Sequence, residues 1–294
     1  MIGEVGNSSK SERYRLYLLC AREVCYLKTT HASPRAGIIA VTSLTLEARI
    51  AVGSGVSVIC SQGSRLAVAL DAAVQSGVSG IISFGVAGGL ARGLVAGAWV
   101  AAAAVKTGQE RFPTDPAWTQ SLLHRLPDAV RADILGMDTL VADPEQKESL
   151  YARTGAAAVD MESHIAARIA AVHQIAFVAC RVIIDPAHRP LPPAALVGLH
   201  PDGTIDAGAV FRSAVREPGQ LPALVRTALD ARVARAALRR GRGMLGSGLG
   251  FPYFRSGSPE ILHNSKHTAG VYTARILKDT KPAGRGRRGA GCLV

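Results

Sequence analysis

The stretch "SGIISFGVAGG", residues 79–89, carries the strongest fold signal in this chain. Its apolar run is continuous, has the length of one strand and shows no alternating polar face. Such a run predicts a strand that is buried on both sides, as in the centre of a parallel sheet. The glycines at its end predict a tight turn, where the backbone can approach a ligand closely.

The segments around this strand alternate between strand and helix patterns. Further strands are predicted at 37–42, 56–60, 98–105, 133–137, 156–161 and 176–184. Helices are predicted at 64–77, 117–126, 145–153, 162–173 and 219–240. This alternation predicts an α/β fold with a mixed or parallel central sheet that is flanked by helices.

The regular pattern occupies residues 37–246, which we interpret as one domain. Residues 1–36 show no clear period, and residues 247–294 form a basic, Gly-rich tail. Segments of this kind have too little apolar surface to form a core of their own. We therefore expect both ends to be poorly ordered.

Composition and charge exclude several classes of protein. The net charge of +12 comes mainly from the two ends and from residues 212–242, which hold eight arginines against Glu217 and Asp230. The rest of the body is not basic, so we expect no nucleic-acid partner. No apolar run has the length that a membrane-spanning helix needs. The five cysteines lack metal or redox spacing, which predicts a cytoplasmic protein with reduced thiols and no metal site.

Acidic residues end two of the predicted strands. Asp160 lies at the end of the strand at 156–161 and Glu162 directly follows it, while Asp185 directly follows the strand at 176–184. One helix and one strand fit between Glu162 and Asp185, so both acids are expected on the ligand-binding rim of the sheet. Each acid also has a structural interpretation, because Glu162 can favour the start of a helix and Asp185 can form a turn.

The chemistry of these side chains suits a sugar that carries a basic leaving group. The Glu162 carboxylate can accept hydrogen bonds from two sugar hydroxyls. Met161 offers a polarisable apolar face to a sugar ring. Asp185 follows two isoleucines, so burial is expected to raise its pKa and to let it donate a proton near neutral pH.

Several motifs together resemble those of a known family. "GVAGGL", "VDMES", "RVIIDPA" and Glu47 resemble the nucleoside phosphorylase/nucleosidase superfamily, in which methylthioadenosine/S-adenosylhomocysteine nucleosidases carry similar motifs in the same order. "LTLEARIA", "ERFPTDPAW", "VDMESHIAARIAA", "LPPAALVGLHPDG" and "PGQLPALVR" resemble the bacterial hopanoid-associated phosphorylase group more closely. The resemblance covers residues 37–246.

The resemblance implies a phosphorylase/nucleosidase-like fold and cleavage of the N-glycosidic bond of an adenine nucleoside. The closer group implies adenosylhopane as substrate, with adenine released in hopanoid biosynthesis. A methylthioadenosine/S-adenosylhomocysteine-type nucleosidase, or another nucleoside phosphorylase in salvage, is the alternative. No cofactor is implied, although phosphate is a possible co-substrate. A homo-oligomer is expected, and the basic helix at 219–240 is a candidate for peripheral contact with the inner membrane face.

The resemblance also implies roles for single residues. Asp185 would protonate the departing adenine, Glu162 would bind the ribose hydroxyls, and Glu47 would orient an attacking water. The expected substrate-binding residues are Met161 under the sugar, Ala87 and Gly88 on the ribose side, Leu140 and Val141 at the base, and Phe112 in a loop toward the 5′ side.

Departures from the family pattern leave the nucleophile open. Val86 replaces the serine of the nucleosidase glycine motif, which removes a hydroxyl that helps phosphorylases bind phosphate. Arg65, Arg49 and Arg181 remain as candidate phosphate-binding cations. Glu47 favours water, whereas the name of the resembled group favours phosphate. Asp160 replaces the first Glu of the V-E-M-E motif and is expected to play a supporting role.

Overall fold

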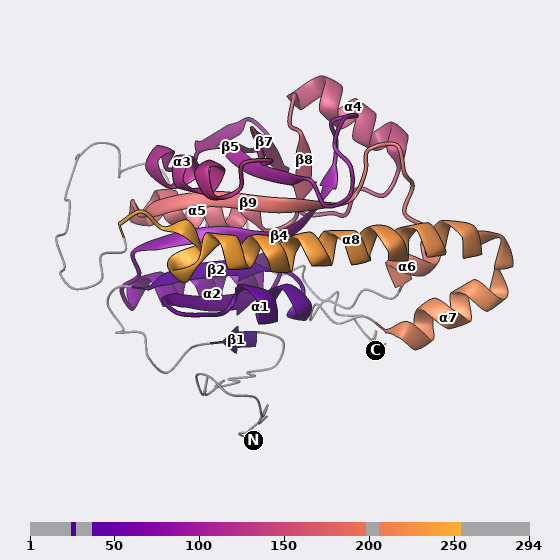
Figure 1. Ribbon diagram of the computed structural model, residues 1–294, viewed down its shortest axis with the longest axis horizontal. Coiled ribbons are helices and arrows are strands. Elements are labelled where there is room, and N and C mark those ends of the chain that lie inside the picture. The colour runs from indigo at the N-terminus through magenta and orange to yellow at the C-terminus, as the bar shows by residue number, and fades with distance from the viewer. Residues whose placement is uncertain (1–24, 28–36, 198–205, 254–294) are drawn as a thin grey trace, which may run out of the picture. The chain divides into compact units, whose positions relative to one another are not determined.

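The computed structural model describes residues 25–27, 37–197 and 206–253 (Figure 1). Most of the two end segments that were predicted to be poorly ordered, and part of the "LPPAALVGLHPDG" motif, lie outside these residues. The described elements form a mixed sheet with helices on both faces. The predicted α/β class with a mixed central sheet is therefore confirmed.

The sheet has nine strands in the order β1-β3-β2-β4-β8-β7-β5-β6, and β9 pairs with both β4 and β5. The strands are β1 (Cys25–Leu27), β2 (Ile38–Thr42), β3 (Val56–Cys60), β4 (Gly80–Gly89), β5 (Trp99–Thr107), β6 (Glu110–Pro113), β7 (Val130–Gly136), β8 (Ala158–Asp160) and β9 (Ala176–Asp185). Because β9 bridges β4 and β5, the pairings β4-β8-β7-β5-β9 close into a ring. This closure brings the ends of β4, β8 and β9 together.

The helices divide into two layers around the sheet. They are α1 (Thr45–Ala51), α2 (Gly63–Gln75), α3 (Pro116–Arg125), α4 (Pro144–Thr154), α5 (Ser163–His173), α6 (Pro193–Val197), α7 (Ala207–Arg216) and α8 (Leu221–Leu245), with short 3-10 turns η1 (Pro218–Gln220) and η2 (Ser247–Gly250). One core cluster joins the sheet to α1, α3 and α8, and another joins it to α2 and α5. Burial of these apolar faces is the main force that holds the layers together.

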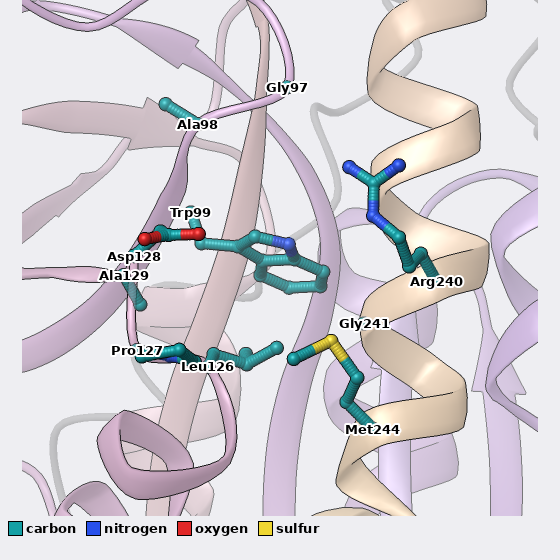
Figure 2. A pocket seen from close by; sticks show the side chains of 10 residues that line it. All are labelled: Gly97, Ala98, Trp99, Leu126, Pro127, Asp128, Ala129, Arg240, Gly241 and Met244. Carbon is teal, nitrogen blue, oxygen red and sulfur yellow. The ribbon is translucent and has the colours of Figure 1, made fainter.

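The long helix α8 lies along the sheet beside β4 and β9 (Figure 1). Its C-terminal half packs so closely that Gly241 faces the indole of Trp99, where an added Cβ would lie 2.2 Å from the ring (Figure 2). Trp99 in turn packs against Phe84 of β4, with ring centroids 5.9 Å apart. Only a glycine allows this close approach of helix and ring.

The predicted strands and helices are confirmed within a few residues, but two details differ. The glycines at the end of the 79–89 run do not form a turn, because Gly88 and Gly89 continue β4 and pair with β8. A register shift between Ala87 and Gly88 lets the same segment pair with Asp185 of β9. Helices α1, α6 and α7 and strands β1 and β6 were not predicted. All but α7 are too short for a clear periodic signal.

None of the helices in the described part of the chain is long and apolar enough to cross a membrane.

Trp118 on α3 tests how the core depends on one large side chain. It is fully buried, its Nε1 donates to the carbonyl oxygen of Leu249 at 3.0 Å, and its ring packs edge-on against Phe251. Trp118→Ala should lower the free energy of unfolding by about 3–5 kcal/mol because it leaves a cavity. Urea denaturation followed by circular dichroism measures this change.

Val68 on α2 supplies the control, because it is 72% exposed. Val68→Ala should change the free energy of unfolding by no more than about 0.5 kcal/mol. Equal effects of the two substitutions would contradict the assigned core.

Candidate active site

A buried arginine lies among acidic side chains where β4, β8 and β9 meet. Arg181 on β9 is fully buried, and its Nε lies 2.6 Å from Asp160 Oδ2. Its Nη2 lies 3.2 Å from Glu162 Oε2 and donates to Ser83 Oγ at 2.5 Å. A buried guanidinium requires such partners, since an unpaired charge in the interior is strongly unfavourable.

Glu47 contributes a third carboxylate, and the backbone holds it in place. Its Oε2 accepts from the backbone N–H groups of Ser43 and Leu44, both at 3.0 Å, at the start of α1. Its Oε1 accepts from the N–H of Val86 on β4 at 2.7 Å. The Glu47 side chain therefore caps its own helix and bridges to β4, which sets its orientation.

Gly85 provides the space in which Glu47 and Arg181 approach β4. A Cβ at this position would lie 2.5 Å from Glu47 Oε1 and 2.8 Å from Arg181 Nη1. The φ of Gly85, +154°, is also one that other residues rarely adopt. The first glycine of "GVAGG" thus leaves room for the side chains of the carboxylate cluster.

Asp160 forms hydrogen bonds with Ser163, the first residue of α5. Its Oδ1 accepts from the backbone N–H of Ser163 at 3.1 Å, and its Oδ2 accepts from the Ser163 hydroxyl. The Ser163 hydroxyl also lies 2.9 Å from Ser83 Oγ on β4. Asp160 therefore links β8, α5 and Arg181, in keeping with the supporting role that was predicted for it.

Burial and mutual repulsion keep protons on this cluster near neutral pH. Burial raises the pKa of Glu162 to about 8, Arg181 opposes that rise, and Asp160 and Glu47 add to it. Burial also raises the pKa of Glu47, again against the attraction of Arg181. Three carboxylates face one guanidinium, so full ionisation would leave excess negative charge in a medium of low polarity.

A second charged pair lies at the end of β9. The Asp185 carboxylate is 7% exposed, and its Oδ2 accepts from Lys147 Nζ of α4 at 2.5 Å. Lys147 is fully buried and also donates to the carbonyl oxygens of Pro186 and Arg189, at 3.3 and 3.1 Å. Its three N–H groups are thus all used, and they tie α4 to the segment after β9.

The pKa of Asp185 is raised to about 6, mainly by burial, while Lys147 limits the rise. The predicted direction of this shift is confirmed, but the neighbouring cation was not foreseen. With this pKa, roughly a tenth of Asp185 is protonated at pH 7 and the rest is paired with Lys147. Such a group can exchange a proton with a bound ligand near neutral pH.

Both charged groups lie against β4, three residues apart. Glu47 and Arg181 face Gly85, whereas both Asp185 oxygens would lie 3.4 Å from a Cβ on Gly88. Three residues of extended chain span about 10 Å. The positions on β4 that the carboxylate cluster and Asp185 approach are therefore about 10 Å apart along the strand.

The structure places the remaining predicted substrate-binding residues differently from one another. Ala87 is buried between Val86 and Gly88, and Met161 is half-buried beside Glu162. Val141 is buried in a small apolar cluster with Val159, whereas Leu140 is 45% exposed. Phe112, which was predicted in a loop, instead lies on β6 and packs against the core cluster that includes α2 and α5. Their roles toward a ligand stay predictions.

The three candidate phosphate cations are not gathered at one place. Arg181 is enclosed by carboxylates, so its charge is already compensated, which argues against its predicted role as a phosphate ligand. Arg49 and Arg65 lie exposed on α1 and α2. Their predicted role toward phosphate is untested by this geometry.

Lys147 is the charged residue at this site that sequence reasoning missed. A signal for it existed: Lys147 precedes the buried Leu150 by three residues on α4, so both side chains lie on the same helix face. A lysine on the inward face of an otherwise polar helix indicates a buried partner.

Two hydroxyls near the same edge of the sheet stay without a partner among the described residues. Thr42 Oγ1 and Ser61 Oγ are buried, and neither makes a hydrogen bond with the part of the chain that the structure describes. Thr42 is the last residue of β2, and Ser61 directly follows β3. The N–H of Ser61 donates to the carbonyl oxygen of Thr42 at 3.2 Å, so the two residues are neighbours. Buried hydroxyls in this state can receive a ligand or an ordered water.

The described residues offer no cluster of metal ligands, and a hollow elsewhere in the structure is not lined by the predicted site residues. Within residues 25–27, 37–197 and 206–253, no group of three or more His, Cys, Asp or Glu side chains is placed to hold a metal ion. A hollow of about 120 Å³ lies between Trp99, Leu126 and the C-terminal half of α8 (Figure 2). None of the residues predicted for the site lines it.

Comparisons with known proteins agree with the predicted superfamily. The model of a family described as the phosphorylase superfamily matches residues 5–221. No curated protein matches the sequence.

Solved structures with a similar fold are distant in sequence. A methylthioadenosine/S-adenosylhomocysteine nucleosidase of Helicobacter pylori is 14% identical, with a TM-score of 0.49 over 71% of this chain and 98% of that chain. A futalosine hydrolase of the same organism is 15% identical, with a TM-score of 0.49 over 71% and 97%. A nucleosidase of Colwellia psychrerythraea in complex with adenine is 19% identical, with a TM-score of 0.47 over 53% and 84%.

The buried pair of Lys147 and Asp185 should control how stability depends on pH. Because the folded-state pKa of Asp185 is raised, its contribution to stability is present at low pH and is lost as the pH rises through about 6. Lys147→Met removes the cation that limits this rise, so the pKa should increase further. The loss of stability should then grow with pH and reach about 3–5 kcal/mol above neutrality.

The double substitution Lys147→Met with Asp185→Asn is the matched control, because it leaves neither charge unpaired. Urea denaturation at about pH 5 and about pH 8 should show that the double variant recovers most of the loss at the higher pH. If the two substitutions are additive at both pH values, the pair does not act as assigned.

Proposed function

The chain belongs to the phosphorylase superfamily and is an enzyme that acts on nucleosides, and we propose that it cleaves the N-glycosidic bond of an adenine nucleoside. The observation that carries this proposal is the pair of charged groups along β4. A buried carboxylate cluster faces Gly85, and an acid with a pKa of about 6 faces Gly88. Groups with separated pKa values at opposite ends of one site are suited to acid–base chemistry.

Asp185 is the proposed general acid for the departing base. Cleavage of the bond leaves negative charge on adenine, and a proton delivered to N7 neutralises it. Lys147 keeps the Asp185 carboxylate oriented through a hydrogen bond and ties it to the segment after β9. The raised pKa lets Asp185 hold a proton in part of the molecules at neutral pH.

Glu162 is the proposed ligand of the ribose hydroxyls, and Met161 is the proposed contact with the sugar ring. The breaking bond leaves positive charge on the sugar in an oxocarbenium-like transition state. A nearby cluster with excess carboxylate would stabilise that charge. Arg181 keeps Glu162 in place during this change through the ion pair at 3.2 Å.

Water is the proposed nucleophile, and Glu47 is its proposed acceptor. The backbone N–H groups of Ser43, Leu44 and Val86 hold the Glu47 carboxylate toward β4. The guanidinium of Arg181 is already paired with Asp160 and Glu162, so it offers a phosphate dianion no uncompensated charge. The acidic character of the cluster therefore supports hydrolysis.

Phosphate attack is the second candidate, and the unpartnered hydroxyls of Thr42 and Ser61 favour it. Their oxygens lie at the ends of neighbouring strands and have no partner among the described residues. Hydroxyls and exposed cations such as Arg65 and Arg49 are groups that bind phosphate oxygens. In that case the product is a ribosyl 1-phosphate derivative instead of a free sugar.

Adenosylhopane is the proposed substrate, because the motifs of residues 37–246 resemble those of the hopanoid-associated group. A lipid on the 5′ carbon would need an apolar rim around the sugar. We also propose that the enzyme is a homo-oligomer in the cytoplasm and that it contacts the inner membrane face. The alternative substrate is a small 5′-thio nucleoside in salvage.

Asp185→Asn should abolish adenine release while the fold is kept, because asparagine retains the shape and loses the transferable proton. The expected loss in kcat/KM is about 10²–10⁴-fold. Release of free adenine from adenosine-type substrates, followed by chromatography, measures it. Asp128 is an exposed acid in the loop between α3 and β7, outside the residues proposed for the site, so Asp128→Asn should keep turnover near that of the wild type. Full activity of Asp185→Asn would rule out the assigned general acid.

The nucleophile can be read from the product. In phosphate-free buffer the wild type should release adenine and a free ribosyl product at a rate that added phosphate does not change. Glu47→Gln should slow this release, because a neutral amide cannot accept the proton of water. Mass spectrometry of the sugar product decides between the candidates, since a phosphorylated sugar and a strict need for phosphate would establish the second.

A further inference from the structure

Helix α8 has a second apolar face that points away from the sheet. Leu221, Val225 and Leu229 recur every four residues and form the outer row of α8. They expose 49%, 57% and 52% of their surface, whereas Val233, which continues the spacing, lies beside Gly97. The residues of α8 that are buried begin only at Ala234 and occupy the other side of the helix.

The helix before it repeats the pattern on a smaller scale. Phe211 and Val215 lie four residues apart on α7 and are 69% and 61% exposed. Arg212 and Arg216 follow each of them directly and are exposed as well. Large apolar side chains that are exposed in a row are not expected on a surface that meets only water.

Arginines accompany the outer row, and nothing in the described structure neutralises them. Arg226 and Arg232 each lie three residues from Leu229 on the helix, and Arg240 continues the same side one turn beyond Ala236. All three are exposed, and none forms an ion pair with any residue of the described ranges. Asp230, the acid of α8, is paired with Arg189 on the other side.

We infer that the outer row of α8 docks on an anionic lipid bilayer. An apolar row interleaved with arginines matches the boundary between acyl chains and headgroups. The apolar side chains enter the acyl region, while the arginine stems lie along it and their guanidinium groups reach the anionic headgroups. A bilayer of neutral lipid offers acyl chains but no anionic headgroups for the arginines, so the surface is specific for negatively charged lipid.

A second copy of the chain fits this face less well. A two-fold dimer through the outer row would place the same arginines of both copies against each other. The face offers no free carboxylate among the described residues to compensate them, because Asp230 is engaged elsewhere. Like charges in contact would therefore oppose the apolar gain.

The inference does not depend on the proposed reaction. Sedimentation with vesicles tests it, using phosphatidylglycerol mixed with phosphatidylcholine in one arm and phosphatidylcholine alone in the other. The full chain should bind the anionic vesicles and lose that binding at high salt. Absence of binding to the anionic vesicles would overturn the proposal.

Two double variants separate the apolar and the charged contributions. Val225→Gln with Leu229→Gln should weaken vesicle binding about tenfold or more, because two apolar side chains no longer enter the lipid. Arg226→Gln with Arg232→Gln should weaken it about 25-fold, at about fivefold for each arginine, and should reduce its salt dependence. Wild-type binding by either variant would contradict the assigned surface.

Val68→Gln with Arg131→Gln is the matched control. It removes one exposed apolar side chain on α2 and one exposed arginine on β7, away from α8, and should bind as the wild type does. Circular dichroism confirms that all variants are folded. Analytical ultracentrifugation tests whether a second copy covers the outer row instead. A wild-type dimer that dissociates in Val225→Gln with Leu229→Gln but in no other variant, together with no vesicle binding, would assign the row to a second copy.

Adenine release from a small nucleoside is measured on the same samples. The outer row lies outside the residues proposed for catalysis, so turnover on a substrate without a lipid should be equal in all variants. A failure of turnover in the wild type would count against the proposed reaction, while the vesicle result still decides the role of α8.

Discussion

The pairing of one buried arginine with surrounding carboxylates is the constraint on which the site depends. Arg181 stands on a strand that is paired on both sides, by β4 and β5, so its guanidinium cannot reach water. Asp160 and Glu162 must therefore stay beside it, and they bring the end of β8 and the start of α5 with them. The closed ring of strands and the cluster support each other, because the ring excludes water and the charges need the ring to hold them.

Glycines on β4 let the charged side chains approach this strand closely. Gly85 leaves room for Glu47 and Arg181, and Gly88 leaves room for Asp185. Burial raises the pKa of Glu162 to about 8 and that of Asp185 to about 6. The difference reflects the partners, since Glu162 shares one cation with other carboxylates whereas Asp185 has Lys147 to itself.

Helix α8 joins the catalytic fold to its surroundings. Its C-terminal half is a core element, in which Gly241 admits the Trp99 ring and Leu238 and Leu245 fill the space under the sheet. Its N-terminal half has no fully buried residue and carries the outer row with its arginines. Because only the C-terminal half of α8 is packed into the core, its N-terminal half can contact a partner without disturbing the sheet. An enzyme whose substrate carries a lipid would gain from this arrangement, because the site would stay close to the membrane.

The sequence by itself determined the α/β class and most strands and helices, and it singled out Glu162 and Asp185 as candidate site residues, because apolar periodicity and strand-end acids are local signals. Tertiary structure alone decided that the glycines after Val86 continue β4, since only pairing with β8 and β9 satisfies their backbone. It also decided that Arg181 is paired with carboxylates and that Lys147 faces Asp185 from another element. Charge pairs between residues 19 or more positions apart leave no periodic mark on the chain, and only the closed ring of strands brings them within hydrogen-bond distance.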